Sequence, residues 1–273
     1  MTSWTLDDAA DQADLERAFC LLEKSSFADK TTRALGTPVS KALALLPADW
    51  SGRVNRATEV ALEKALTFVV RTLKDEPHAA ASRAAHKLLS GLTGALGGAF
   101  GLPALAIELP LSLMIMLRSI ADIARSEGES TRESAAKLAC LEVLALGGIG
   151  DAQDAAKSGY YAVRMAMAAA VSEAIRYVAE KGIVEEGAPA LVRLLTKIAS
   201  RLSLQVTEKS AAQAIPIIGA VGGAAINLLF IDHFQDLARG HFTVRRLERK
   251  YGVDKVRDSY ENCGTKLATE LEG

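Results

Sequence analysis

Residues 91–117 read GLTGALGGAFGLPALAIELPLSLMIML, an apolar stretch of membrane length that is rich in glycine. A helix that spans a bilayer needs about 20 predominantly apolar residues, and this stretch meets that length. It also carries Pro103 and Pro110, and a proline inside a helix removes a backbone hydrogen bond and bends the axis. We therefore expect two shorter helices that meet near Leu102 and Pro103, forming an apolar hairpin instead of one straight rod.

A second uncharged stretch, SAAQAIPIIGAVGGAAINLLFI, runs from Ser210 to Ile231 and contains Pro216. In both stretches small residues recur four apart, which places them on one helix face and lets two backbones approach closely. We predict that glycines with this spacing mediate helix packing: Gly94, Gly98, Gly97, Gly101, Gly219 and Gly223. No Gly-Lys-Ser/Thr ending and no preceding strand accompanies these glycines, so we expect no nucleotide.

Three environments stay open for the two apolar stretches. They form a hairpin in a protein core, a hairpin inserted into or docked on one leaflet of a bilayer, or a set of spanning helices. Glu108 lies inside the first stretch. It would cost about 2.5 to 3.5 kcal/mol at the centre of a bilayer unless it is paired or faces protein.

The remaining chain has the pattern of helices. Apolar residues recur at helical spacing almost throughout, and runs of alternating β-branched residues bounded by turns are absent. Apolar residues make up 49% of the chain and aromatic residues only 5%, a mixture typical of closely packed helices. We predict an all-α protein of roughly eight to ten helices, folded as a single multi-helix domain around two glycine-rich apolar helical hairpins.

Charge and cysteine usage exclude several classes of partner. The 32 basic and 33 acidic residues give a formal charge of −1, so no global positive field could hold a phosphate backbone, and we expect no nucleic acid. Cys20, Cys140 and Cys263 are widely separated, which fits a reducing compartment. The acidic N-terminus lacks the basic-then-apolar order of a secretory signal, so we expect a cytoplasmic protein.

Polar residues that border the apolar stretches form a candidate site. Some follow the second stretch in NLLFIDHFQDLARGHF, where several side chains fall three, four or eight apart on a helix. Others lie in or just after the first stretch, where Arg118 and Asp122 can pair on one face. The candidates are Glu108, Arg118, Asp122, Asn227, Asp232, His233, Asp236 and His241.

Each group of candidates has two interpretations. His233, Asp236 and His241 could converge on a metal ion, more loosely than a helical zinc pair, or could cap and pair the hairpin end where it reaches water. Glu108 is either an ordinary solvated or paired charge or a buried acid whose raised pKa suits it to bind a cation, a proton or a lipid headgroup. The His-Glu-x-x-His and Gly-x-Ser-x-Gly motifs are absent, so we assign no catalytic residue and expect no cofactor.

A cluster of basic residues follows the second apolar stretch. Such residues could contact anionic lipid headgroups, each contributing about 1 kcal/mol near a membrane surface. The interleaved Glu248 and Asp254 favour an ordinary solvated helix face instead. The five residues of the basic cluster are Arg239, Arg245, Arg246, Arg249 and Lys250.

Three blocks, in this order, resemble the EcsC family of bacterial proteins: GGAFGLPALAIELPLSLMIMLRSIADIA, LACLEVLALGG and IPIIGAVGGAAINLLFIDHFQDLARGHFTVRRLERKYG. The resemblance covers roughly residues 45–260, and the third block is the most specific. It implies a helical protein with hydrophobic segments that is associated with membranes by inference. The family is named after the third product of an operon that encodes an ABC transporter linked to protein secretion, and its biochemical activity is not established.

On this resemblance we divide the chain into an N-terminal helical extension (1–44), an EcsC-like helical domain (45–262) and a C-terminal tail (263–273). We expect a membrane-associated or lipid-binding accessory protein of the bacterial cell envelope that supports a transport or secretion process. It would be peripheral to or inserted in the inner membrane, with membrane lipid or a membrane protein complex as partner. Two alternatives stay open: a hydrolytic or metal-dependent enzyme with a site at the hairpin ends, and a soluble helical scaffold.

Overall fold

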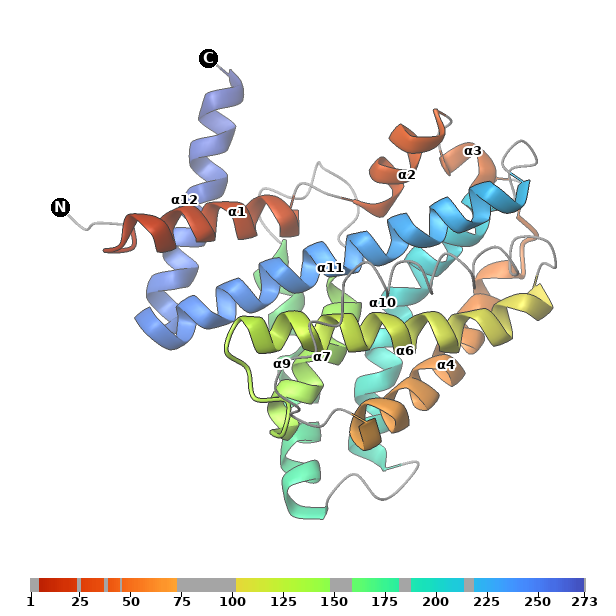
Figure 1. Ribbon diagram of the computed structural model, residues 1–273, viewed down its shortest axis with the longest axis horizontal. Coiled ribbons are helices and arrows are strands. Elements are labelled where there is room, and N and C mark those ends of the chain that lie inside the picture. The colour runs from red at the N-terminus through yellow and green to blue at the C-terminus, as the bar shows by residue number, and fades with distance from the viewer. Residues whose placement is uncertain are drawn as a thin grey trace.

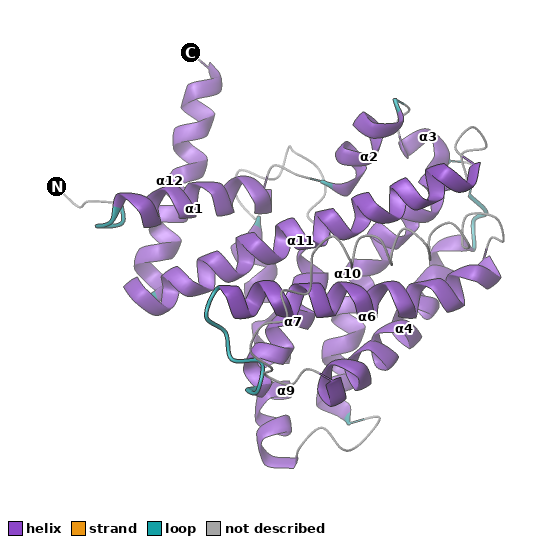
Figure 2. Cartoon of the chain, in the orientation of Figure 1, coloured by secondary structure: helices purple, strands orange, loops and turns teal. Residues whose placement is uncertain are grey.

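The described residues form helices and no strand (Figure 2). The computed structural model describes residues 5–23, 26–36, 39–44, 46–72, 102–147, 159–181, 188–213 and 219–272. Within these ranges ten helices follow one another: α1 (Ala9–Glu23), α2 (Phe27–Leu35), α3 (Val39–Leu43), α4 (Trp50–Thr72), α6 (Leu102–Ser126), α7 (Ser134–Leu146), α9 (Tyr160–Lys181), α10 (Pro189–Gln213), α11 (Gly219–Tyr251) and α12 (Val253–Glu272). The predicted all-α fold is confirmed.

Helices α6 and α11 lie side by side and run in the same direction (Figure 1). Midway along the pair, Gln235 Nε2 donates to Ser119 Oγ at 2.8 Å. Beyond the end of α6, Arg246 Nε donates to Glu127 Oε2 at 2.8 Å. Because the contacting residue numbers rise together, the two helices are parallel, and both begin at the same end of the molecule.

Helix α6 contains the second half of the first apolar stretch. It begins at Leu102, so the second of the two helices expected in this stretch starts where it was predicted, while the first lies outside the described residues. Pro103 falls in the first turn, where a missing N–H costs nothing. The helix continues through Pro110 to Ser126.

The inner face of α6 is buried in the protein core. Leu109, Leu113, Met116 and Leu117 are fully buried, whereas Leu111 on the opposite face is 45% exposed. Spacings of three and four residues bring the buried side chains onto one stripe of the helix. The described part of residues 91–117 therefore lies mainly in the protein core, which is the first of the three environments considered for this stretch.

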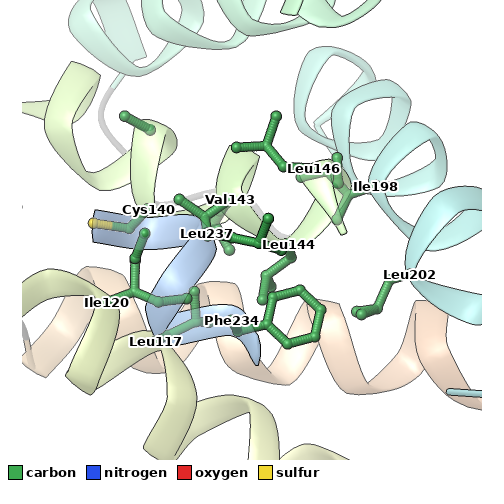
Figure 3. Close-up of a cluster of buried hydrophobic side chains, with 14 of the residues drawn as sticks. Leu117, Ile120, Cys140, Val143, Leu144, Leu146, Ile198, Leu202, Phe234 and Leu237 are labelled. Carbon is green, nitrogen blue, oxygen red and sulfur yellow. The ribbon is translucent and has the colours of Figure 1, made fainter. Parts of the chain in front are cut away.

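In the part of the core that Figure 3 shows, side chains from four helices meet. Helix α4 packs against α6 and α10, while α7 packs against α9, α10 and α11. Burial of apolar surface contributes about 25 cal/mol per Å², and this convergence is the main stabilising feature of the fold. The labelled side chains, from α6, α7, α10 and α11 in turn, are Leu117, Ile120, Cys140, Val143, Leu144, Leu146, Ile198, Leu202, Phe234 and Leu237.

The helices near the two chain ends pack on the second half of α11. Helix α1 crosses α11 at Gly240, where a Cβ atom would lie 2.6 Å from Leu22 Cγ and 3.1 Å from the Ala18 carbonyl oxygen. Gly252 separates α11 from α12 with a φ of 87°, a left-handed conformation that favours glycine. Helix α12 runs without a break through the predicted boundary at 262/263, and the three-part division of the chain stays a prediction.

No helix in the described ranges is both long enough and apolar enough to span a bilayer.

Candidate functional site

Glu108 and Lys209 form an ion pair in the interior, between α6 and α10. Lys209 Nζ lies 2.6 Å from Glu108 Oε1, and the two side chains are 0% and 5% exposed. The same ammonium group lies 5.1 Å from the centroid of the Phe230 ring on α11. Burying a charge costs several kcal/mol, about as much as a well-placed partner returns. Glu108 is therefore both buried and paired, which combines the two interpretations that its sequence context allowed.

Lys209 belongs to a row of polar side chains along the inner face of α10. Successive members are four residues, or about 6 Å, apart along the helix axis. Arg201, the first member of this row, donates a hydrogen bond from Nε to the carbonyl oxygen of Ala145 at 3.1 Å, near the end of α7. We call Arg201, Gln205, Lys209 and Gln213 the α10 polar row.

Several polar atoms on the two helices that form the ion pair are buried without a hydrogen bond. Ser112 lies one turn after Glu108 on α6 and is fully buried, and Gln205 is 2% exposed. Within the part of the chain that the structure describes, Ser112 Oγ, Gln205 Oε1 and Nε2, and Gln213 Nε2 have no hydrogen-bond partner. Native interiors leave few polar atoms unsatisfied, so these four atoms are unused hydrogen-bonding capacity.

Glu108, Ser112, Gln205, Lys209 and Gln213 together are named the buried polar site. Gly147, directly after α7, closes one side of it, since a Cβ atom there would lie 2.2 Å from Gln205 Nε2. The site lies between helices from four parts of the chain, and only Glu108 was predicted from the sequence. Lys209 was missed because it directly precedes the uncharged stretch that begins at Ser210; the four-residue spacing of the α10 polar row was the signal that could have revealed it.

Arg118 and Asp122 do not join this site. Arg118 is exposed on α6. Asp122 forms its ion pair with Arg125, three residues later, instead of the predicted pair with Arg118, four residues earlier. The prediction of that pair is corrected because Arg125 offers Asp122 a partially buried guanidinium on the same face.

His233 is a neutral ring in the core of the protein. It is 1% exposed, and the backbone of Gly147 lies beside its ring. Burial lowers the pKa of His233 to about 3, and the nearby Lys30 acts in the same direction. Asp236, three residues later, accepts a hydrogen bond from Lys30 Nζ at 2.7 Å and also pairs with Arg239.

His241 is fully buried and lies in a different environment. Its Nδ1 lies 2.9 Å from the hydroxyl oxygen of Tyr160 on α9, and burial holds the pKa of His241 well below its usual range. His233 and His241 are about 12 Å apart along the helix axis, and Asp236 is held by basic side chains. No group of three or more potential ligands in the described ranges could hold a metal ion, so the weak metal candidates do not converge.

The two remaining candidates also lie on α11. Asn227 is fully buried, and Asp232 is partially buried. Four of the predicted packing glycines, Gly94, Gly97, Gly98 and Gly101, lie outside the described residues. Gly219 is the first residue of α11, and Gly223 is buried one turn later.

A second group of buried charges surrounds α9. Arg164 donates two hydrogen bonds to Glu248, at 2.6 and 3.1 Å, and the Tyr161 hydroxyl donates a third at 3.1 Å. Glu142 on α7 is 6% exposed, and burial raises its pKa, opposed by Arg164 and Arg245. Hydrogen bonds from Arg164 and Tyr161 to Glu248 therefore join α9 to α11.

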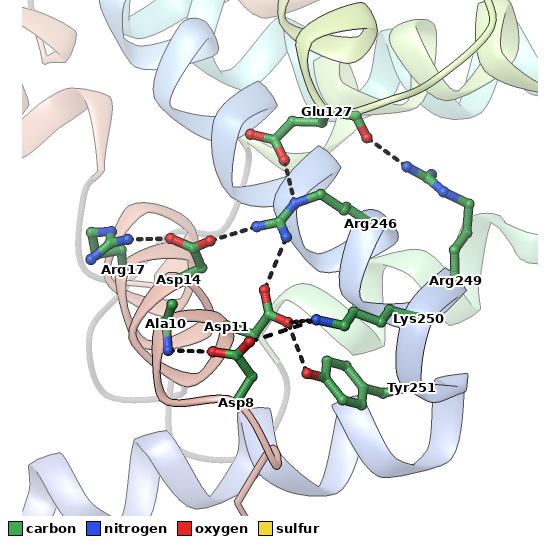
Figure 4. A network of polar contacts seen from close by, with 10 residues as sticks. All are labelled: Asp8, Ala10, Asp11, Asp14, Arg17, Glu127, Arg246, Arg249, Lys250 and Tyr251. Carbon is green, nitrogen blue, oxygen red and sulfur yellow. Dashed lines mark hydrogen bonds and ion pairs between the residues drawn. The ribbon is translucent and has the colours of Figure 1, made fainter.

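Acidic side chains neutralise the basic cluster of α11 (Figure 4). Arg246 forms ion pairs with Asp11 and Asp14 of α1, at 3.1 and 2.6 Å, and with Glu127 at 2.8 Å. Lys250 pairs with Asp11, and this contact, together with hydrogen bonds from Tyr251 and Arg246, lowers the pKa of Asp11 to about 2. The acidic partners therefore come from distant parts of the sequence.

The other three members of the basic cluster are also paired. Arg245 and Arg249 share Glu129, which lies between α6 and α7. Arg239 pairs with Asp236 on its own helix. In this arrangement the cluster presents no unpaired row of positive charge, and the headgroup contact expected of it stays a prediction.

Comparison with known proteins places the chain in a family. No curated protein matches it, and no solved structure matches it. The model of the EcsC protein family matches residues 21–247, which include most of the helices and the whole buried polar site. The chain therefore belongs to the EcsC protein family.

Proposed function

We propose that the protein is a membrane-associated accessory protein that docks on a lipid bilayer with the end at which α6 and α11 begin. One observation carries this proposal. The two helices are parallel neighbours, and each contains the last part of one of the two apolar stretches (Figure 1). The residues of both stretches that precede these helices are consequently attached at one end of the helical body and can enter the same leaflet.

The charged residues support this orientation. Helix α11 begins in the uncharged stretch and ends in the basic cluster, so the ion pairs with α1 lie toward the opposite end. Docking through apolar side chains removes about 25 cal/mol per Å² of apolar surface from water and resists salt, whereas docking through exposed charges is screened. We infer a salt-resistant, end-on contact with lipid.

The cellular role that we propose rests on the resemblance of the sequence to the EcsC family. An accessory role in a transport or secretion process of the bacterial cell envelope, with a membrane protein complex as a further partner, is part of the same proposal. Cytoplasmic location with peripheral or inserted contact at the inner membrane completes it.

Flotation with liposomes tests the docking step. The full chain, purified without detergent, is mixed with phosphatidylcholine vesicles in low and high salt and centrifuged through a density gradient. We expect flotation in both salt concentrations.

Ile217→Asp, in the second apolar stretch, should abolish flotation, because an acid in the leaflet costs several kcal/mol. Val253→Asp is the matched control, since Val253 is 54% exposed at the start of α12 and should tolerate the change. Protein that stays at the bottom with every vesicle would reject the proposal.

A further inference from the structure

Helix α1 carries two acids that contact the last turns of α11. Asp11 and Asp14 lie three residues apart, and both pair with Arg246, at 3.1 and 2.6 Å (Figure 4). Asp11 also accepts hydrogen bonds from Lys250 at 2.5 Å and from the Tyr251 hydroxyl at 2.8 Å. This part of α11 therefore binds two carboxylates that follow one another on the same face of a helix.

Apolar side chains continue the contact between α1 and α11. Leu15, Ala18 and Leu22 are 0%, 1% and 3% exposed. At Gly240 the two backbones lie so close that a Cβ atom would be 3.1 Å from the Ala18 carbonyl oxygen. A side chain larger than that of Ala18 would therefore not fit at this position of α1. We name four residues of α11 the α1-binding face: Gly240, Arg246, Lys250 and Tyr251.

The charges of the α1-binding face stay satisfied when α1 is absent. Arg246 also pairs with Glu127, at 2.8 Å, and retains this partner when Asp11 and Asp14 leave. The Lys250 side chain is 52% exposed, so water can hydrate its ammonium group. Departure of α1 therefore leaves neither cation of the face buried and unpaired, a state that would be strongly unfavourable.

Helix α1 is also held less firmly than the core helices. Four of its 15 residues are buried, whereas ten of the 13 residues of α7 are buried. The side chains of Arg246 and Asp14 are 32% and 30% exposed, and ion pairs of such exposure contribute little and are screened by salt. Elements with few buried apolar side chains open at a lower free energy than the core. We therefore expect α1 to open as a unit while the core stays folded.

The family match includes part of this face but little of α1. It begins at residue 21, two residues before the end of α1, and extends to residue 247. Gly240 and Arg246 lie inside the matched region, whereas Asp11 and Asp14 lie outside it. The family model therefore contains the basic side of the contact without its acids.

We propose that the α1-binding face is a docking site for an acidic amphipathic helix of a partner protein, and that α1 occupies this site when the partner is absent. The sequence of α1 from Asp11 to Leu22 gives the pattern that such a helix needs, Asp-x-x-Asp-Leu-x-x-Ala-x-x-x-Leu. This inference goes beyond lipid docking and does not rest on it, because Gly240 is about 32 Å along the helix axis from the first residue of α11.

A second copy of this chain is a less favourable occupant of the face. Its α1 offers the same contacts and no others, so exchange of α1 between two copies gains nothing against the cost of association. A partner helix has to displace an α1 whose attachment to the chain gives it an effective concentration on the order of mM. The partner must therefore combine the acidic pattern of α1 with contacts of its own outside this face.

A labelled α1 peptide tests the docking site. A peptide of residues 5–23, with a fluorophore on the exposed Cys20, is titrated with the full chain and followed by fluorescence anisotropy. The variant Asp11→Ala with Leu15→Glu keeps its own α1 undocked, because Glu at this buried position would be an unpaired charge. We expect this undocked variant to bind the peptide at least about tenfold more tightly than the wild type, since α1 no longer competes.

Changes in the peptide test the pattern of α1. Asp11→Asn with Asp14→Asn should weaken binding to the undocked variant about tenfold, because two charge-assisted contacts become neutral. Ala18→Leu should also weaken it, because the face has no room for the larger side chain. Ala10→Leu is the matched control at an exposed position and should leave binding unchanged. Binding that is indifferent to the two aspartates would overturn the proposal.

Two exposed lysines of the protein test the position of the bound peptide. In the undocked variant, Lys250→Gln should weaken binding of the unchanged peptide, because Asp11 loses its ammonium donor. Lys64→Gln, at an exposed position of α4, is the matched control and should leave binding unchanged. Equal affinities of the two proteins would place the peptide elsewhere and overturn the proposal.

Hydrogen exchange of the wild type tests the opening of α1 without any variant. Amides of α1 should exchange faster than those of α11, and faster still in high salt. Exchange of α1 only together with α11 would overturn the proposal. An undocked variant that dimerises without binding the peptide would assign the face to a second copy and would overturn it as well. None of these measurements uses vesicles, so their failure leaves the lipid-docking proposal standing.

Discussion

At the residue scale, the Glu108–Lys209 pair predicts opposite effects of single and double substitutions. Lys209→Met alone leaves a buried carboxylate without its partner, so the free energy of unfolding should fall by about 3 to 5 kcal/mol. Adding Glu108→Leu removes that charge and should restore most of the loss. Urea denaturation followed by circular dichroism measures both variants. Equal stability of the wild type and the Lys209→Met variant would show that the pair is not buried as described.

Glu142 predicts a pH dependence with a definite sign. Burial raises the pKa of Glu142 above its ordinary value near 4.5, so the folded state retains a proton that the unfolded state releases. The stability of the wild type should therefore fall, relative to Glu142→Gln, as the pH rises above 4.5, and the two proteins should converge at lower pH. Thermal unfolding across this range measures the difference. The exposed Glu261→Gln serves as control and should show no such divergence.

At the element scale, the crossing of α1 and α11 depends on Gly240. A Cβ atom at this position would meet Leu22 Cγ at 2.6 Å and the Ala18 carbonyl oxygen at 3.1 Å, so Gly240→Ala must push α1 away from α11. We expect a loss of about 1 to 3 kcal/mol in the free energy of unfolding. Gly52→Ala is the matched control, because Gly52 is exposed in α4 with no atom within 4 Å of the added Cβ; it should stabilise by about 0.5 to 1 kcal/mol. Equal effects of the two substitutions would contradict the close crossing.

At the scale of the whole molecule, the sequence predicted what depends on local pattern. Helical periodicity is a property of neighbouring residues and predicted the all-α fold, while Pro103 predicted the start of α6 near Leu102. Tertiary partners do not follow from local pattern. Lys209 lies 101 residues from Glu108, and Arg246 lies 235 residues from Asp11, so the sequence placed Glu108 and Arg246 beside apolar stretches without their counter-charges. Likewise, Asp122 has two arginines nearby on its own helix, and it pairs with Arg125, whose guanidinium is partially buried.

A depth-sensitive fluorophore reports which end of the molecule contacts lipid. In a Cys20→Ser background, which removes the exposed cysteine, Ile217→Cys and Val253→Cys are each labelled with an environment-sensitive fluorophore. Vesicles of brominated phosphatidylcholine are then added in high salt. We expect strong quenching of the label at Ile217 and none of the label at Val253. Equal quenching at both positions, or quenching at Val253 alone, would contradict docking through the end at which α6 and α11 begin.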